Sequence, residues 1–507
     1  MSTDPFVRSS AATLIWSQAG LPRNLMGGTD AMRAASLSGT IASASSTSAG
    51  IPVQASYLPR WPLETEDAWR SRVSATFLTP YYARAWQTVV GKAFSENVEL
   101  GDDVPKEIVD LWENIDNAGA HGDVFCQWVF GDSLHVGIGH ILVDYPVADG
   151  VQTLADERSL GLRPNWVYVP GDAVLGVRSE IVNGRVRMTQ FRYLEETVEA
   201  DGLFGERSVK RARVYYASDA ENPFARVEVY VMGKDGAQLE ASNVLRPHTE
   251  IPVSTFYARR TGWQAARPFL QELAWVNLEA WQSGSDQRNI LHFARVPFYH
   301  FAGFTKEEID AFTGVGGAAR AWTTDPGANI HVVEGRGTAI GEGWKDLERL
   351  DRDAKGLSLE PMVSGFAAES ATGRAIDEAR AHSALESAIR NFEDCIEGAL
   401  GFTAIWMGLD SGSGGSVSLV EELSASENVA EKAQIILTAE RNGLISKATA
   451  REQLHELHIF SETFDPEAEG ERAEQESASA MAAFGGFGQG NATDTEETTP
   501  QPAEEAA

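Results

Sequence analysis

Side chains that could do chemistry are few and scattered in this chain of 507 residues. His455 and His458 lie three residues apart on an expected helix, a spacing that could place two imidazoles on one metal ion. The HExxH spacing of the zinc proteases and a further ligand from elsewhere in the sequence are both missing. The pattern therefore favours two histidines on a solvated helix face over a zinc centre.

Two glycine motifs bear on nucleotide binding. Gly91-Lys92 is followed by Ala93 and lacks the upstream glycine of a GxxxxGK[ST] loop, which excludes an ATP-driven motor of that class. Gly137 and Gly139 come before the apolar strand residues ILVDY (141–145), whereas a dinucleotide-binding fold needs its glycines after the strand. A turn between a helix and a strand explains these two glycines better.

The sequence also shows no convincing site for acid–base or nucleophilic catalysis. His121-Gly-Asp123 lies at the expected N-terminus of a helix, where the carboxylate of Asp123 suits the helix dipole. Ser364-Gly365 is not part of a GxSxG nucleophile elbow. Because no catalytic, metal or cofactor site emerges, we expect a protein that is not an enzyme and that needs no cofactor.

The composition is globular and strongly acidic. Hydrophobic residues make up 43% of the chain and charged residues 23%, and the net charge is −31. Twelve acidic residues and one arginine follow from Glu462 onward, so the C-terminal tail holds part of this charge. Proteins that bind nucleic acid normally carry a basic surface patch. The acidic surface indicates either simple solubility or a surface that lets a polyanion slide past, and charge alone does not separate the two.

The sequence also bears on the cellular compartment. No run approaches the roughly 20 apolar residues that span a bilayer, and the N-terminus lacks the basic and apolar regions of a secretory signal. Cys126 and Cys395 each lie in an apolar periodic segment, which favours two buried thiols. We expect a protein that assembles in the cytoplasm and does not enter a membrane.

A long helix ending at Val296-Pro297 and followed by a short aromatic strand is the most informative element. Its apolar stripe is interrupted by Asn277, Ser285 and Asn289, which is unusual for a helix packed into an ordinary core. Such a helix suits packing against copies of itself or lining a wet passage. This pattern is the first indication of a ring.

The other elements indicate an α+β fold. Six segments between 163 and 257 alternate apolar and polar residues and are separated by Asn-Gly and Asp-Gly turns, which predicts strands. Helical periodicity precedes them and returns after the aromatic strand, in a charged helix near 344–355 and a long segment starting near 371. Between these two lies a stretch rich in Gly, Ser and Ala.

Four phrases, in this order and spacing, resemble those of tailed-bacteriophage portal proteins over roughly residues 55–460. They are YLPRWPLETEDAWRSRVSATFL, DNAGAHGDVFCQWVFGDSLHVGIGHILVDYP, PFLQELAWVNLEAWQSGSDQRNILHFARVPFYHFAGF and GLISKATAREQL. The resemblance implies a portal fold with a mostly helical wing, stem and crown, a strand-rich part of the wing and a small α/β clip. It divides the chain into a flexible N-terminal arm (1–54), wing (55–266), first stem helix (267–296), clip (297–341), second stem helix (342–356), tunnel loop (357–373), long wing helix and following segment (374–423), helical crown (424–462) and disordered acidic tail (463–507).

The resemblance also implies a function. Portals form rings, usually of twelve subunits, at one capsid vertex of the virion, where they serve as the channel for packaging and ejection of double-stranded DNA. Their partners are the terminase large subunit, the major capsid protein and head–tail adaptor or tail proteins. The tunnel-loop residues that would face the DNA are Glu360, Met362, Ser364, Phe366 and Glu369.

Basic residues of the stem are the other candidates for the channel. They are Arg288 on the first stem helix and Lys345, Arg349, Arg352 and Lys355 on the second. The second-helix residues alternate with Asp346, Glu348, Asp351 and Asp353. Weak contacts to DNA phosphates and ion pairs with the neighbouring subunit's helix explain this alternation equally well.

Two other functions compete with a portal. A minor head or adaptor protein would bind capsid partners without forming a DNA channel, and it would lack the helix–clip–helix–loop–helix succession over 267–400. A nuclease of a packaging complex would need clustered acidic metal ligands, which the strands of 163–257 do not show.

Overall fold

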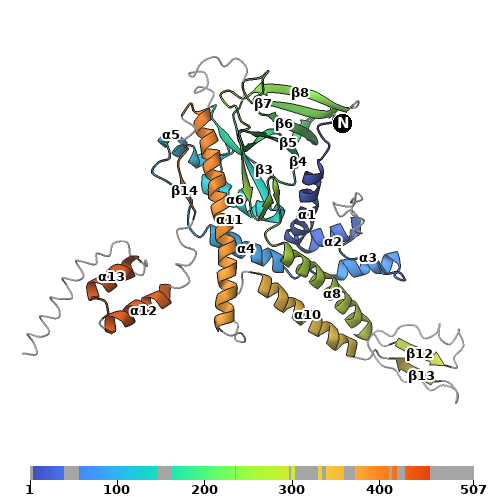
Figure 1. The fold of residues 1–507 in the computed structure, drawn as a ribbon. Coiled ribbons are helices and arrows are strands. Elements are labelled where there is room, and N and C mark those ends of the chain that lie inside the picture. Colours follow the sequence, from blue (N-terminus) through green and yellow to red (C-terminus); the bar gives the residue numbers. More distant parts are fainter. Residues whose placement is uncertain are drawn as a thin grey trace, which may run out of the picture. The chain divides into compact units, whose positions relative to one another are not determined.

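The computed structural model describes residues 4–38, 56–146, 162–233, 236–295, 298–302, 329–333, 338–358, 371–409, 414–419, 429–442 and 444–456. The chain forms two compact units, residues 1–421 and 422–507. Both helices and strands build the first unit, which agrees with the α+β class (Figure 1). Within the described ranges, no helix is long and apolar enough to cross a membrane.

The N-terminal segment is folded, so the expectation of a flexible arm over 1–54 is wrong for most of its length. Helix α1 (Ser10–Met26) begins at Ser9, whose hydroxyl accepts a hydrogen bond from the amide of Ala12, and α2 (Gly28–Ser38) follows directly. Apolar side chains of both helices are buried in the core. The low-complexity stretch after Ser36 suggested a flexible arm, and residues 39–55 lie outside the described ranges.

Arg23 of α1 ties this segment to the rest of the unit. Its guanidinium donates to both carboxylate oxygens of Asp132, at 2.9 and 3.0 Å, and also to the carboxylate of Asp172. Both partners lie more than a hundred residues further along the chain. This contact explains why a serine- and alanine-rich helix is held against the core.

Helices continue up to the first sheet. They are α3 (Glu66–Ala75), α4 (Tyr81–Ala93), the short α5 (Lys106–Val109), the single 3-10 turn η1 (Trp112–Asn114) and α6 (Gly122–Val136). The expected break at Pro80 is confirmed, because Pro80 is the N-cap of α4. Helix α6 ends at Gly137 with a φ of 91°, a left-handed conformation that favours glycine.

A three-stranded sheet lies at the centre of the core. Its order is β3 (Asn165–Pro170), β2 (Ile138–Asp144) and β9 (Val253–Tyr257), all antiparallel. The predicted buried strand ended by Pro146 is confirmed as β2. Because β2 has a neighbour on each edge and helix α11 against it, six of its seven residues are buried.

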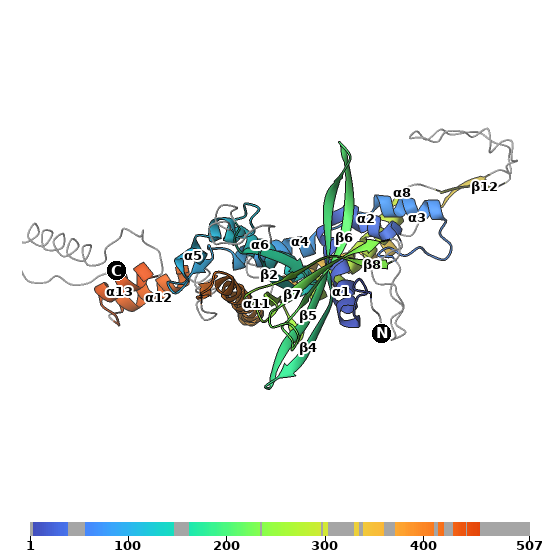
Figure 2. The same cartoon turned by 90° about the horizontal axis from the view of Figure 1, so that it is seen from above.

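A second sheet is an antiparallel meander of five strands (Figure 2). They are β4 (Val174–Val182), β5 (Arg185–Asp201), β6 (Gly205–Tyr216), β7 (Arg226–Gly233) and β8 (Gly236–Val244). Strands β4 to β7 and the turns at Asn183-Gly184 and Asp201-Gly202 are confirmed as predicted, with Asn183 and Gly184 both at positive φ. Asp235, of the third predicted turn, lies outside the described residues. Strand β8 was not predicted, because its sequence carries only one β-branched residue and is mostly exposed.

Helix α8 (Gln271–Arg295) leads into a hairpin of β12 (Phe298–Ala302) and β13 (Asn329–Val333), which is followed by α10 (Thr338–Leu357). Helix α8 starts four residues later than the helix expected over 267–296, and α10 starts four residues earlier than the one expected over 342–356. The two helices lie side by side (Figure 1).

The long helix expected from 374 is α11 (Ala371–Trp406). It ends well before residue 423, and β14 (Val417–Ser418) then pairs with β1 (Glu99–Leu100). Two short strands, β10 (Arg260–Gly262) and β11 (Ala265–Ala266), form a small hairpin before α8.

The second unit contains α12 (Val429–Arg441) and α13 (Lys447–Glu456). The end expected near Asn442-Gly443 is confirmed by the last residue of α12. Helix α13 begins after Ser446, whose hydroxyl accepts from the amide of Thr449 at 3.1 Å. The acidic tail lies outside the described residues.

Candidate functional site: the paired helices α8 and α10

Helices α8 and α10 pack closely through polar as well as apolar contacts. The hydroxyl of Ser283 donates to Asp346 at 2.7 Å, and the amide nitrogen of Gln287 donates to the carbonyl of Ile340 at 3.0 Å. Gly343 allows this approach, because a Cβ built there would lie 1.9 Å from the amide oxygen of Gln287. Leu350 of α10 is buried as well. The pair is therefore held in a defined register.

The polar interruptions of the α8 stripe have partners within the same chain. Asn277 is fully buried, and its amide accepts from the backbone N–H of Tyr82 at 3.0 Å and donates to the carbonyl of Thr79 at 2.9 Å. The buried hydroxyls of Ser285 and Thr76 lie 3.0 Å apart in a hydrogen bond. The interpretation that these two residues face sister subunits or a wet passage is wrong. They bind the segment between α3 and α4 instead, and Asn289 is only half-buried.

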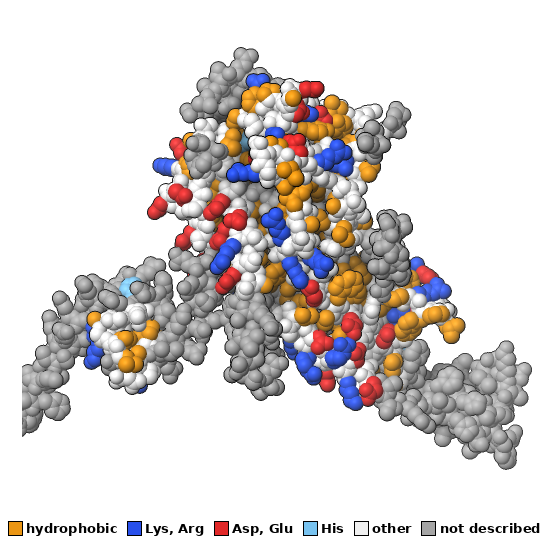
Figure 3. All heavy atoms as spheres, viewed as in Figure 1, with side chains coloured by type: hydrophobic (Ala, Val, Ile, Leu, Met, Phe, Trp, Pro, Cys, Tyr) orange, Lys and Arg blue, Asp and Glu red, His pale blue; other side chains and the backbone are white. Residues whose placement is uncertain are grey.

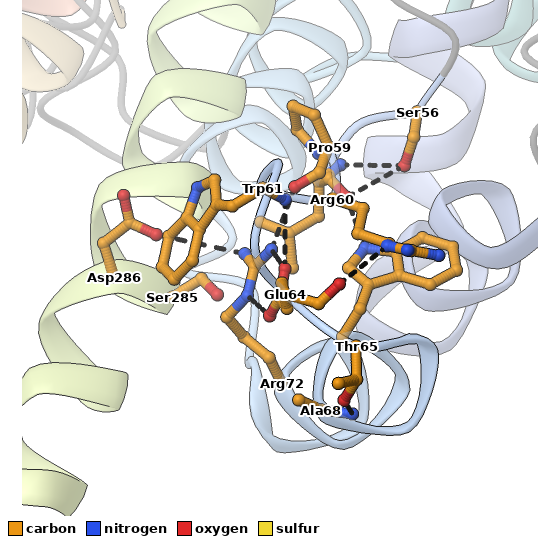
Figure 4. A network of polar contacts seen from close by, with 12 residues as sticks. Ser56, Pro59, Arg60, Trp61, Glu64, Thr65, Ala68, Arg72, Ser285 and Asp286 are labelled. Atoms are coloured by element: carbon orange, nitrogen blue, oxygen red, sulfur yellow. Dashed lines mark hydrogen bonds and ion pairs between the residues drawn. The ribbon is translucent and has the colours of Figure 1, made fainter.

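A buried ion pair joins α3 to the segment before it, beside Ser285 (Figure 4). The guanidinium of Arg72 donates to both carboxylate oxygens of Glu64, each at 2.7 Å, and to the carbonyl of Pro59 at 2.9 Å. Its Cζ lies 4.1 Å from the centre of the Trp61 ring. Only 4% of the Arg72 side chain and 8% of the Glu64 side chain are exposed. Their bidentate geometry compensates the desolvation of both charges.

This ion pair also touches α8. The third guanidinium nitrogen of Arg72, Nη1, lies 3.9 Å from the carboxylate of Asp286. Burial raises the pKa of the Asp286 carboxyl, against the opposing effect of Arg72. Hydrogen bonds from Arg72 lower the pKa of Glu64. Sequence reasoning missed this network, because Arg72 lies 8 and 13 positions from Glu64 and Pro59, which is no helical spacing, and Asp286 belongs to a distant part of the sequence.

The basic residues of α10 are mostly paired along their own helix. Lys345 binds Glu342 at 2.8 Å, and Lys355 binds Asp351 at 2.7 Å. Arg349 contacts Asp346 at 3.1 Å and Asp353 at 3.0 Å. These are the i, i+3 and i, i+4 pairs that one helix makes by itself. Figure 3 shows the resulting mixture of acidic and basic side chains over α8 and α10.

Arg349 also reaches across to α8, where it binds Glu279 at 2.7 Å. Ion pairs with a neighbouring subunit, one of the two explanations offered for the alternating charges, are therefore not needed, since Lys345, Arg349 and Lys355 already have partners within the chain. Arg352 is exposed, and no hydrogen bond or ion pair joins it to another described residue. Arg288 donates to the carbonyl of Ala75 at 3.3 Å and lies over the Phe77 ring.

The candidate residues of the tunnel loop, from Glu360 to Glu369, lie outside the described residues, as does the segment 303–328 between β12 and β13. No cluster of three metal-ligating side chains occurs in the described part of the chain. His455 lies in α13, and His458 is not described.

The other sequence motifs have structural roles. His121 is the N-cap of α6, accepting from the amide of Asp123 at 3.3 Å, and Gly137 forms the predicted helix-to-strand turn. Gly91 and Lys92 lie inside α4. Both cysteines are buried free thiols, and burial raises the pKa of Cys395 to about 12.

Replacing Asn277 by alanine should lower the free energy of unfolding by about 2–4 kcal/mol. The substitution leaves the N–H of Tyr82 and the carbonyl of Thr79 buried without partners, and each such group costs about 1–3 kcal/mol. Denaturant unfolding followed by tryptophan fluorescence measures the change. The matched control is Asn289→Ala on the same helix, which should change stability by less than about 0.5 kcal/mol. Equal effects of the two substitutions would contradict the role assigned to Asn277.

One family model matches this region of the chain. The family model of a domain of unknown function, DUF4055, matches residues 269–407, which include α8, α10 and α11. No curated protein sequence matches the chain.

Two solved structures are similar over more of the chain. One is a chain from the neck of an empty GTA particle computed with C6 symmetry, with 14% identity and a TM-score of 0.42, covering 74% of this chain and 90% of that chain. Another comes from the virion of a native gene transfer agent (GTA) particle, with 11% identity and a TM-score of 0.40, covering 84% of this chain and 98% of that chain.

Proposed function

We propose that this chain is a structural subunit of a phage-like particle, and more specifically a portal protein. About twelve copies would form a ring at one capsid vertex, through which double-stranded DNA is packaged and ejected. The subunit has no enzymatic activity in this proposal and needs no cofactor. Its partners would be the terminase large subunit, the major capsid protein and adaptor or tail proteins.

One observation carries the proposal. Two helices, α8 and α10, pack side by side and are joined through the β12–β13 hairpin, and the long helix α11 follows. This succession fits a stem, a clip and a wing helix behind a loop, which is the order that the sequence resemblance implies. A minor head or adaptor protein without a channel has no need of this arrangement.

The charges of α10 fit a passage for DNA. A row of unpaired cations would hold phosphates and make sliding depend steeply on salt. Lys345, Arg349 and Lys355 are instead neutralised by carboxylates of the same chain. The protein as a whole carries a net charge of −31. A polyanion would therefore meet little attraction along this helix, with Arg352 as the exposed exception.

The channel part of the proposal is tested by deleting residues 364–369 in the particle that carries this protein. We expect subunits that assemble normally while the DNA content of the particles falls, as measured by quantitative PCR of nuclease-protected DNA. The control is a deletion of six residues within the acidic tail, which should leave DNA content unchanged. Failure of the loop-deleted subunits to assemble would contradict the assignment of a tunnel loop to this segment.

A further inference from the structure

Two ribbons leave the five-stranded sheet in opposite directions (Figure 2). Both contain β5, whose 17 residues span roughly 58 Å at about 3.4 Å per residue. The first half of β5 pairs with β4 and the second half pairs with β6. Strand β4 reaches no further along β5 than Tyr193, and β7 reaches no further along β6 than Arg211. Each ribbon is therefore two-stranded toward its tip.

The basic ribbon, residues 178–188, carries three arginines and one glutamate. Arg187 is bound to Ser218 at 2.7 Å, but no hydrogen bond or ion pair joins Arg178 or Arg185 to another residue in the described ranges. Burial, and after it the charge of Arg178, lowers the pKa of the Arg192 guanidinium. Positive charge at this end of the sheet is thus incompletely compensated.

A hollow of about 740 Å³ lies at the base of the basic ribbon. Arg178, Arg187 and Tyr216 are among its lining residues. Further along the ribbon, 76% of the Ile181 side chain is exposed. The acidic residues of the lining, Glu180 and Asp219, are paired with Arg187 and Arg226. This end of the sheet therefore combines a hollow that contains the guanidinium of Arg178, unpaired among the described residues, with exposed apolar side chains.

The acidic ribbon, residues 196–208, has the opposite character. It carries four acidic residues and one basic residue, Arg207. At its tip Asp201 and Glu206 flank the turn, and neither makes an ion pair with a described residue. Between them Leu203 is 86% exposed and Phe204 is 94% exposed. A projecting two-stranded ribbon with an apolar tip is marginal by itself and suits contact with a partner.

We propose that the acidic ribbon of one copy docks on the basic ribbon of the next copy. Phe204 would enter the hollow between Arg178 and Tyr216 of the second copy, because guanidinium groups and aromatic rings attract each other. Asp201 and Glu206 would pair with the unpartnered Arg178 and Arg185. The inference deepens the proposed function, since it names a contact between neighbouring subunits of the ring.

A second copy is the occupant that these observations favour. The complementary surfaces lie at opposite ends of one strand, so a contact between them is head-to-tail and can be repeated around a closed ring. Contact between two acidic tips, or between two basic tips, would bring like charges together and is disfavoured. The arrangement therefore selects the heterologous contact over a two-fold dimer.

Disulfide cross-linking tests the contact in the full-length protein. Chains with Phe204→Cys and chains with Ile181→Cys are co-expressed with tags of different size and then oxidised. The native Cys126 and Cys395 are buried and do not compete. We expect the mixed covalent dimer to exceed either dimer of like chains by about tenfold or more. In the control, Leu239→Cys, on an exposed part of β8, replaces Ile181→Cys and should give no product above background.

A mixed product no more abundant than that of the control, or than the dimers of like chains, would overturn the contact. Absence of the cross-linked product can be told apart from absence of ring assembly. Rings without the mixed product would leave the proposed function standing and refute the contact. Cross-linked open chains without rings would support the contact and contradict the portal.

Charge reversal provides the second measurement, and it requires no oxidation. Asp201→Arg with Glu206→Arg should raise the subunit concentration needed for assembly about tenfold. Arg178→Glu with Arg185→Glu should raise it by a similar factor. A chain carrying all four substitutions restores opposite charges across the contact and should assemble nearly as the unaltered chain does. If the four-substitution chain assembles no better than the two-substitution chains, the proposed pairing is wrong.

Discussion

Replacing Arg72 by methionine should lower the free energy of unfolding by about 3–5 kcal/mol, because it leaves the carboxylate of Glu64 buried without its partner. The guanidinium also binds the carbonyl of Pro59 and lies over Trp61, so the segment before α3 loses several contacts at once. Denaturant unfolding at neutral pH measures the loss.

Arg70→Met is the matched control for this prediction. Arg70 lies on the same helix and pairs with Glu66 at 2.9 Å, but about half of each side chain is exposed. Exposed pairs of this kind contribute about 0.3–0.5 kcal/mol. Equal losses from Arg70→Met and Arg72→Met would contradict the view that burial makes the Arg72 pair important.

The same ion pair predicts a pH dependence. Arg72 lowers the pKa of Glu64 below its ordinary value of 4.5. The stability that the pair contributes is therefore fully present above that ordinary value and is lost as the pH falls through the lower pKa of the folded state. The difference in stability between the unaltered chain and Arg72→Met should shrink on acidification. A difference that stays constant down to the pH where both chains unfold would contradict this linkage.

Replacing Phe392 by alanine should cost about 3–5 kcal/mol, which is the usual range for a buried phenylalanine. Phe392 of α11 is fully buried, and its ring centre lies 4.9 Å from that of Phe256 and 5.3 Å from that of Phe130. The phenyl ring of Phe392 thereby packs the long helix α11 against β9 and α6. Denaturant unfolding, at a concentration where all variants share one oligomeric state, measures the loss.

Phe204→Ala is the control for Phe392→Ala, because it removes the same atoms from an exposed site. It should leave the stability of the subunit within about 0.5 kcal/mol of the unaltered chain. A loss comparable to that of Phe392→Ala would show that the tip of the acidic ribbon is packed within its own subunit, against the contact proposed above.

Local patterns predicted much of the fold. The alternation of apolar and polar residues located β3 to β7 and β9, and the turn at Asn183-Gly184 predicted a hairpin because both positions adopt positive φ easily. Strand β8 escaped prediction because it is exposed and poor in β-branched residues. Helix α1 escaped because the low-complexity stretch after it outweighed the apolar Ile15 and Leu25, which the structure buries.

The candidate site was harder to predict, because its key contacts join distant parts of the sequence. Asn277 looked like an interruption of an apolar stripe, and its partner Tyr82 lies 195 residues away. The spacing of Lys355 and Asp351 on one helix could have indicated an intrahelical pair. The contact of Arg349 with Glu279 required knowledge of how α8 and α10 pack.

Negative-stain electron microscopy of the purified full-length protein tests the central proposal most directly. Class averages should show closed rings of about twelve subunits with a central hole, the form expected of a heterologous contact that closes. A protein that forms compact closed dimers, with no rings at any concentration, would contradict the portal proposal.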